Sequence, residues 1–185
     1  MTIQIRDLTE LDIKETAKVL YLAFAEHHAD YVPTEEDAQQ ELHDCMADEM
    51  ISRIAVNDQG VIVGMIGGRP SYAYVWELHP LAVHPDHERQ GVGGALVLDL
   101  EARVKVRGGM TIMLGTDDEN NQTSLSGVDL YPDVWEHVKK IGNINNHPYE
   151  FYQKMGYVIV GLVPDANGFG KPDILMAKRL FDPPK

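Results

Sequence analysis

The stretch VHPDHERQGVGGAL, residues 83–96, has the residue types of a loop that holds phosphate groups. Gly91, Gly93 and Gly94 lie where a helix is expected to begin, near Val92, and glycines let backbone N–H groups approach a ligand closely. The first turn of a helix offers N–H groups without intrahelical partners and the positive end of the helix dipole. A pyrophosphate can therefore be held here by main chain, without a cluster of Lys and Arg.

The common nucleotide-binding motifs do not match this loop. The Rossmann fingerprint G-x-G-x-x-G would need glycine where Leu96 stands, and a Walker loop would need Gly-Lys-Ser/Thr, which is absent. An ordinary glycine-rich turn between a strand and a helix also fits the residue types. His79, His84 and His87 follow a strand and a loop with no accompanying Cys or carboxylate set, so we expect no metal site.

Composition limits the classes of partner. The 185 residues carry a formal net charge of -13 with 44% hydrophobic content, which suits one globular domain over residues 1–185. Nucleic acid and anionic membranes need a basic face, so we expect neither as a partner. A cationic partner fits the charge, and so does simple solubility. Without a basic, apolar N-terminal segment or a bilayer-length apolar run, we expect a cytoplasmic protein.

Hydrophobic periodicity predicts a mixed α/β domain of the α+β kind. Capping patterns at Thr9 and Thr34 begin two helices, and the second is strongly acidic. The expected strands are residues 3–8, 51–56, 60–68, 73–83, 110–116, 157–163 and 173–180, and the other expected helices are residues 92–108, 134–140 and 148–155.

Two motifs resemble those of the GNAT acetyltransferase superfamily. ERQGVG, residues 88–93, resembles the acetyl-CoA motif Q/R-x-x-G-x-G/A, with Glu88 where Gln or Arg is usual. NNHPYEFYQKMGY, residues 145–157, resembles N-x-x-A-x-x-F-Y-x-K-x-G-F/Y and departs from it only at Pro148. The segments WELHPL, LGTDDENNQTSLS, HPYEFYQKMGYVIVG and PDANGFGKPDILMAK further resemble the aminoglycoside 6'-N-acetyltransferases, over about residues 74–178.

The resemblance implies a GNAT fold, in which helices flank a central, mostly antiparallel, twisted sheet that splays at the acetyl-CoA site. It implies transfer of acetyl from acetyl-CoA to the 6'-amine of an aminoglycoside, by direct attack within a ternary complex, and hence antibiotic resistance. It also implies a homodimer. The first 70 residues match only as a general pattern.

Residue roles follow from the same resemblance. An ammonium group must lose a proton before it attacks a thioester, and Glu77 is the expected proton acceptor, with His79 second. Tyr152 matches the tyrosine that protonates the departing thiolate. The expected acetyl-CoA contacts are Leu81, Ala82, Val83, Glu88, Arg89, Gln90, Gly91, Val92, Gly93, Gly94, Asn145 and Tyr152.

Carboxylates are expected to hold the cationic acceptor. Asp117-Asp118-Glu119 follows the strand at 110–116, and an acidic helix covers about residues 35–48. A wide negative field of this kind raises the local concentration of cations. The named acceptor-site candidates are Glu77, Asp117, Tyr72, Glu26 and Glu136.

Two alternative functions fit the same sequence. A GNAT enzyme that acetylates another amine, such as a polyamine or a protein N-terminus, would share every residue of the acetyl-CoA site. A non-catalytic acyl-CoA sensor would bind the cofactor without turnover, and the pair Glu77 and Tyr152 argues against it.

Overall fold

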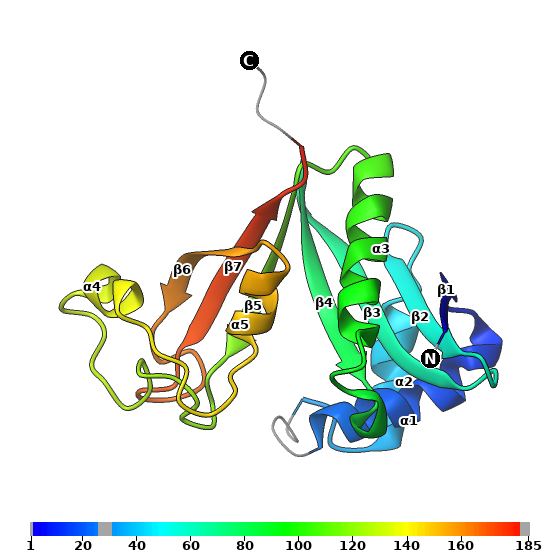
Figure 1. Cartoon of the computed structure of the whole chain (residues 1–185), viewed down its shortest axis with the longest axis horizontal. Helices are drawn as coiled ribbons and strands as arrows, with labels where there is room; N and C mark the ends of the chain where they lie inside the picture. Colours follow the sequence, from blue (N-terminus) through cyan, green and yellow to red (C-terminus); the bar gives the residue numbers. More distant parts are fainter. Residues whose placement is uncertain (1, 26–30, 182–185) are drawn as a thin grey trace. The chain divides into compact units, whose positions relative to one another are not determined.

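The computed structural model describes residues 2–25 and 31–181. They form two compact units, one up to Ile112 and one from Met113 onward, and Figure 1 shows the elements of each. The described residues contain seven strands flanked by helices, which confirms the mixed α/β class. That the whole chain is one domain stays a prediction. Among the described residues, no helix combines the length and apolar character needed to cross a bilayer.

The first unit is built on an antiparallel sheet in the order β1-β2-β3-β4. Its strands are β1 (Ile3–Asp7), β2 (Ile51–Asn57), β3 (Ile62–Tyr72) and β4 (Val75–Val83), and its helices are η1 (Glu10–Asp12), α1 (Ile13–Phe24), α2 (Glu35–Asp44), η2 (Pro85–His87) and α3 (Val92–Val106). Both expected caps are present, because Thr9 forms a capping box with Asp12 and Thr34 accepts the N–H of Asp37. β3 runs four residues beyond its predicted end at Gly68, which brings Arg69 into the sheet.

Helices pack on the sheet of the first unit through two sets of contacts. α1 and α2 share one buried cluster with Ile54, Met65 and Ala82. α3 instead comes close to β3 at glycines: a Cβ added at Gly64 would lie 3.0 Å from the Val92 side chain, and one at Gly68 would lie 2.6 Å from Leu100. Because glycine has no side chain, α3 can lie directly against β3 at Gly64 and Gly68.

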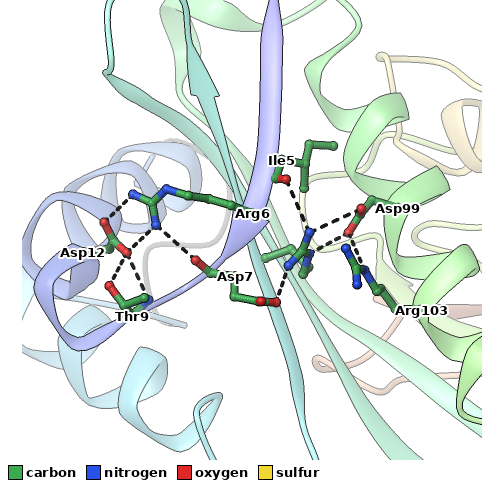
Figure 2. A network of polar contacts seen from close by, with 8 residues as sticks. Ile5, Arg6, Asp7, Thr9, Asp12, Asp99 and Arg103 are labelled. Carbon is green, nitrogen blue, oxygen red and sulfur yellow. Dashed lines mark hydrogen bonds and ion pairs between the residues drawn. The ribbon is translucent and has the colours of Figure 1, made fainter.

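A polar network holds β1, β2 and α3 together. Arg53 of β2 is buried, and its guanidinium pairs with Asp7 of β1 and with Asp99 of α3 at 2.7 Å. Figure 2 shows Asp99 also facing Arg103, whose Nε lies 3.8 Å from it. A buried guanidinium needs such partners, because an unpaired buried charge is strongly destabilising.

The second unit carries the strands β5 (Thr111–Asp117), β6 (Val158–Val163) and β7 (Asp173–Arg179) in the order β5-β7-β6, and β6 and β7 are antiparallel. Its helices are α4 (Val134–Lys139) and α5 (Tyr149–Lys154). All five elements lie within a residue or two of their predicted ranges. Between β5 and α4, buried side chains such as Leu125 and Leu130 give the polar segment a small core of its own.

Candidate active site

β4 carries a bulge in front of the predicted acetyl-CoA strand. Ile66 faces Leu81 and Gly68 faces Leu78, so two residues of β4, His79 and the next, oppose the single Gly67 of β3. A Cβ added at Gly67 would lie 2.2 Å from the carbonyl oxygen of His79, so no other residue fits at this point without a backbone shift. The bulge lies directly before Leu81, the first of the expected acetyl-CoA contacts on β4.

Glu77 lies on β4 opposite Arg69 of β3 and is paired with it. The Arg69 Nε and Nη2 each donate to a Glu77 carboxylate oxygen at 2.9 Å. This fork orients the carboxylate, and it leaves part of the acceptor capacity of each oxygen free, since a carboxylate has about four lone-pair sites. The Glu77 side chain is 25% exposed, so those sites can meet a ligand.

His79, the second predicted proton acceptor, is held by residues that lie outside the strand. Its Nε2 lies 3.1 Å from the Tyr31 hydroxyl and 3.4 Å from a carboxylate oxygen of Glu41 in α2. The ring packs edge-on against Tyr31 at 5.5 Å between centroids, and Tyr31 packs in turn on Phe24 of α1. His79 is thus held by Glu41 of α2 and by Tyr31, which lies between α1 and α2.

The loop from β4 to α3 has the form expected of an anion site. Gly91 is the N-cap of α3 in a left-handed conformation, with φ of 88°, which glycine adopts without strain. The first intrahelical bond runs from the Ala95 N–H to the Gly91 carbonyl, so the preceding N–H groups of the first turn have no partner within the helix. Gln90 is taken up in closing the loop, since its side chain donates to the Asp86 carbonyl at 2.9 Å.

The acidic run after β5 divides into two roles. Asp117 is half-buried and accepts a hydrogen bond from the Asn167 side chain. Asp118 is fully buried and accepts bonds from the Gln122 and Thr123 N–H groups and from the Thr123 and Ser126 hydroxyls. The expectation that this whole run binds a cationic ligand is therefore wrong for Asp118, whose carboxylate closes the loop instead.

Tyr152 is buried on α5, where its ring lies 5.0 Å from Phe151 and 5.8 Å from Tyr157. Burial raises the pKa of its phenol, so Tyr152 is a neutral O–H donor. His147 anchors the start of this helix: its Nδ1 accepts the Tyr149 N–H, and its Nε2 lies 3.1 Å from the Asp117 carbonyl oxygen. Because Nδ1 is the acceptor, Nε2 carries the proton and joins α5 to the end of β5.

The structure also describes the predicted residues Tyr72, Glu136 and Asn145. Glu26 lies outside the described residues. Tyr72 ends β3 and is 70% exposed, while Glu136 on α4 forms ion pairs with Lys139 and Lys140. The backbone of Asn145 is held by Gln122, and its side chain is at the exposed surface.

Sequence reasoning missed the residues that support the predicted ones, namely Arg69, Tyr31, Glu41, Asn167 and His147. If the predicted β3 had extended past Gly68, pairing its residues with those of β4 from the turn after Tyr72 would have placed Arg69 opposite Glu77. No signal in the sequence joins Tyr31 and Glu41 to His79, because that contact depends on where α2 packs. In the described part of the chain, no group of three His, Cys, Asp or Glu side chains is arranged to hold a metal ion.

Comparison with known proteins decides the family. The profile of the Acetyltransferase (GNAT) family matches residues 16–131. The chain belongs to the GNAT acetyltransferase family. The fold class and the recognition of the chain as a GNAT acetyltransferase are thereby confirmed.

Three solved structures of GNAT enzymes match nearly the whole chain. An aminoglycoside 6'-N-acetyltransferase complexed with coenzyme A is 41% identical, with a TM-score of 0.89 and full coverage of both chains. The aminoglycoside 6'-N-acetyltransferase from Enterococcus faecium is 40% identical over 98% of this chain and 99% of that one, with a TM-score of 0.88. An aminoglycoside 6'-acetyltransferase type Ii is 37% identical, with full coverage of both chains and a TM-score of 0.73. No curated protein sequence matches the chain.

Proposed function

We propose that this GNAT protein transfers the acetyl group of acetyl-CoA to the 6'-amine of aminoglycosides. The observation that carries the proposal is full-length similarity, at 41% identity, to a structure of an aminoglycoside 6'-N-acetyltransferase with coenzyme A. The site residues support it, since a carboxylate and an imidazole alternate on β4 beside an α3 N-terminus suited to a pyrophosphate.

In this proposal the acceptor and acetyl-CoA are bound together, and the amine attacks the thioester directly. Glu77, oriented by Arg69, takes the proton of the acceptor ammonium directly or through water, and His79 shares that task. Backbone N–H groups at Leu81 to Val83, just past the bulge, stabilise the thioester oxygen as charge develops on it. Asp117 and the acidic surface attract the cationic drug.

Acetyl-CoA fits the loop at α3 through main-chain groups. The pyrophosphate would be held by N–H groups of Gly91 to Gly94, with the helix dipole in support. Glu88 is exposed and makes no phosphate contact in this proposal, because like charges repel.

Replacing Gly91 by Asp is expected to weaken acetyl-CoA binding by at least about tenfold, because a carboxylate beside the pyrophosphate repels it and φ of 88° strains a non-glycine residue. Calorimetric titration with coenzyme A measures the change. Gly60→Asp is the matched control, since Gly60 also has positive φ, at 79°, and lies in the turn between β2 and β3. Equal affinity in the Gly91 variant and the parent would remove this loop from the cofactor site.

Replacing Tyr152 by Phe is expected to lower kcat by about tenfold, less than the roughly 10²- to 10⁴-fold that a well-matched general acid contributes. The pKa of a phenol, about 10, already exceeds that of a thiol, near 8.5, and burial raises it further, so transfer of the proton to the thiolate is uphill and contributes little. The ring packing is kept, so affinity for acetyl-CoA should be unchanged. Steady-state kinetics with either substrate varied separates the two parameters, and an unchanged kcat would contradict the assignment.

A homodimer, a cytoplasmic location and a role in antibiotic resistance belong to the same proposal. The edge strand β6 supports the first, because Val158 and Val160 are 61% and 50% exposed and leave an apolar edge that a second copy would cover.

A panel of acceptors tests the proposed function. Thiol release from acetyl-CoA is measured with an aminoglycoside that has a 6'-amine, with a matched 6'-hydroxyl compound and with spermidine. Turnover of the 6'-amine alone is the expected result. Turnover of spermidine alone would replace the acceptor with a polyamine, and turnover of none would leave the acyl-CoA sensor or a GNAT enzyme for another amine.

A further inference from the structure

We propose that Glu41 is a positioning residue that holds His79 with Nε2 protonated, so that His79 Nδ1 is the nitrogen that accepts the proton of the acceptor ammonium. The inference rests on the proposed function for the identity of that ammonium. It concerns a residue in the part of the chain where the family resemblance is weakest, and it follows from contacts within the first unit alone.

The groups around His79 Nε2 differ in whether they donate or accept hydrogen bonds. Nε2 has two oxygen neighbours, the Tyr31 hydroxyl at 3.1 Å and the Glu41 carboxylate at 3.4 Å. Hydrogen bonds from His79 and Tyr31 outweigh the effect of burial and lower the pKa of Glu41, so its carboxylate is ionised and acts only as an acceptor.

The Tyr31 hydroxyl has a single proton, and its acceptor decides the role of His79 Nε2. Burial and the nearby charge of Glu41 raise the pKa of its phenol, so Tyr31 stays neutral and has one proton to donate. That proton goes to the charged carboxylate, since bonds to ionised acceptors are the stronger ones. His79 Nε2 then faces two oxygens, both of which serve it as acceptors, and a nitrogen in that position carries hydrogen.

Two further side chains, Cys45 and Arg69, lie near Glu41. Cys45 is buried with its sulfur 3.9 Å from Glu41, and burial raises the pKa of the thiol to about 12, so it adds a neutral group rather than a charge. Arg69 is committed to Glu77. Glu41 is thus the anion next to the imidazole, and its side chain is only 25% exposed.

These steps give His79 a defined chemical form. With Nε2–H directed at Glu41, Nδ1 has its lone pair free. The ammonium nitrogen loses its proton to Nδ1, the resulting imidazolium is stabilised by the Glu41 carboxylate, and the proton later leaves to water. Glu77, which is paired with Arg69, orients the ammonium and shares the proton transfer.

Long-range proton–nitrogen NMR on the whole, nitrogen-15-labelled protein tests the inference without any substrate. The His79 signals are assigned by their loss in His79→Gln, and spectra are taken near pH 8.5, where imidazole is mostly neutral. The parent is expected to show His79 protonated at Nε2 alone. A parent protonated at Nδ1 would overturn the inference, and this measurement needs no Glu41 variant to fold.

Two variants, one on α2 and one on α1, separate a specific effect from a change of charge. Glu41→Gln should shift the Nε2 signal, introduce the second tautomer and lower kcat by at least about tenfold with the KM for acetyl-CoA unchanged. Glu15→Gln removes the same charge from an exposed position of α1, outside the acidic helix, and should leave the spectrum and kcat as in the parent. Identical His79 signals in the parent and in Glu41→Gln would overturn the inference.

The outcome stays distinct from that of the proposed function. Aminoglycoside turnover with a His79 spectrum insensitive to Glu41 would reject the positioning role alone. The expected spectra in a protein that turns over only spermidine would support the positioning role and reject the aminoglycoside.

Discussion

Glu77→Gln is expected to lower kcat/KM for a 6'-amino aminoglycoside by about 100-fold, the lower range of what a positioned proton acceptor contributes. Gln keeps the shape of the side chain and one oxygen for Arg69, so the β3–β4 pairing should survive. What is lost is the negative charge that holds the ammonium and accepts its proton. Because a rising pH supplies more of the free amine, the deficit should narrow at alkaline pH.

Steady-state rates between pH 6 and pH 9 measure this effect, with coenzyme A affinity as an internal check that the fold is intact. Glu15→Gln on α1 is the control for loss of one negative charge, and it should stay within about twofold of the parent. A Glu77 variant with parental kcat/KM throughout that range would exclude the residue from proton transfer and would leave His79 as the acceptor.

Asp118→Ala is expected to lower the free energy of unfolding by about 3 kcal/mol, because it leaves buried donors without their acceptor. The donors are the N–H groups of Gln122 and Thr123, at 2.6 and 2.9 Å, and two hydroxyls. Asp129→Ala is the control: Asp129 is exposed in the same segment, so its loss should cost no more than about 0.5 kcal/mol. Urea unfolding at pH 7 compares the three proteins.

The Asp118 effect should depend on pH in one direction. Burial alone would raise the pKa of this carboxyl, but the hydrogen bonds from Ser126, Thr123 and Gln122 outweigh it and lower the pKa. A group whose pKa is lower in the folded state stabilises the fold above its unfolded pKa, near 3.9, and loses that contribution as the pH falls through the folded value. The difference between parent and Asp118→Ala should therefore be complete above about pH 5 and shrink below about pH 4. A difference that grows in acid would contradict this account.

Local patterns predicted most of the fold. The caps at Thr9 and Thr34 and the glycines before α3 act within a few residues of the chain, so their effects can be read from sequence. β3 was predicted to end at Gly68, yet the strand continues to Tyr72 through a register shift between Pro70 and Tyr72.

The reacting groups of the candidate site were predicted from the sequence, but the residues that hold them in place were not. Glu77 and His79 could be named because alternation on one strand places them together. Arg69 was missed because the predicted β3 ended at Gly68, and Glu41 was missed because it meets His79 only after α2 docks on the sheet. Asp118 was interpreted as a ligand group because the residue type alone does not distinguish a carboxylate that closes a loop from one that binds a drug.

The buried Arg53 has a thermodynamic consequence for cofactor capture. Its bonds to Asp7 and Asp99 tie the middle of α3 to two strands, so the helix start that we propose as the pyrophosphate site is held in place by the fold itself. Ordering of that segment is then completed when the chain folds, and little conformational entropy remains to be lost when acetyl-CoA arrives. Breaking the Arg53 link would transfer that entropy loss to the binding step, where it would appear as weaker affinity for a ligand that never touches Arg53.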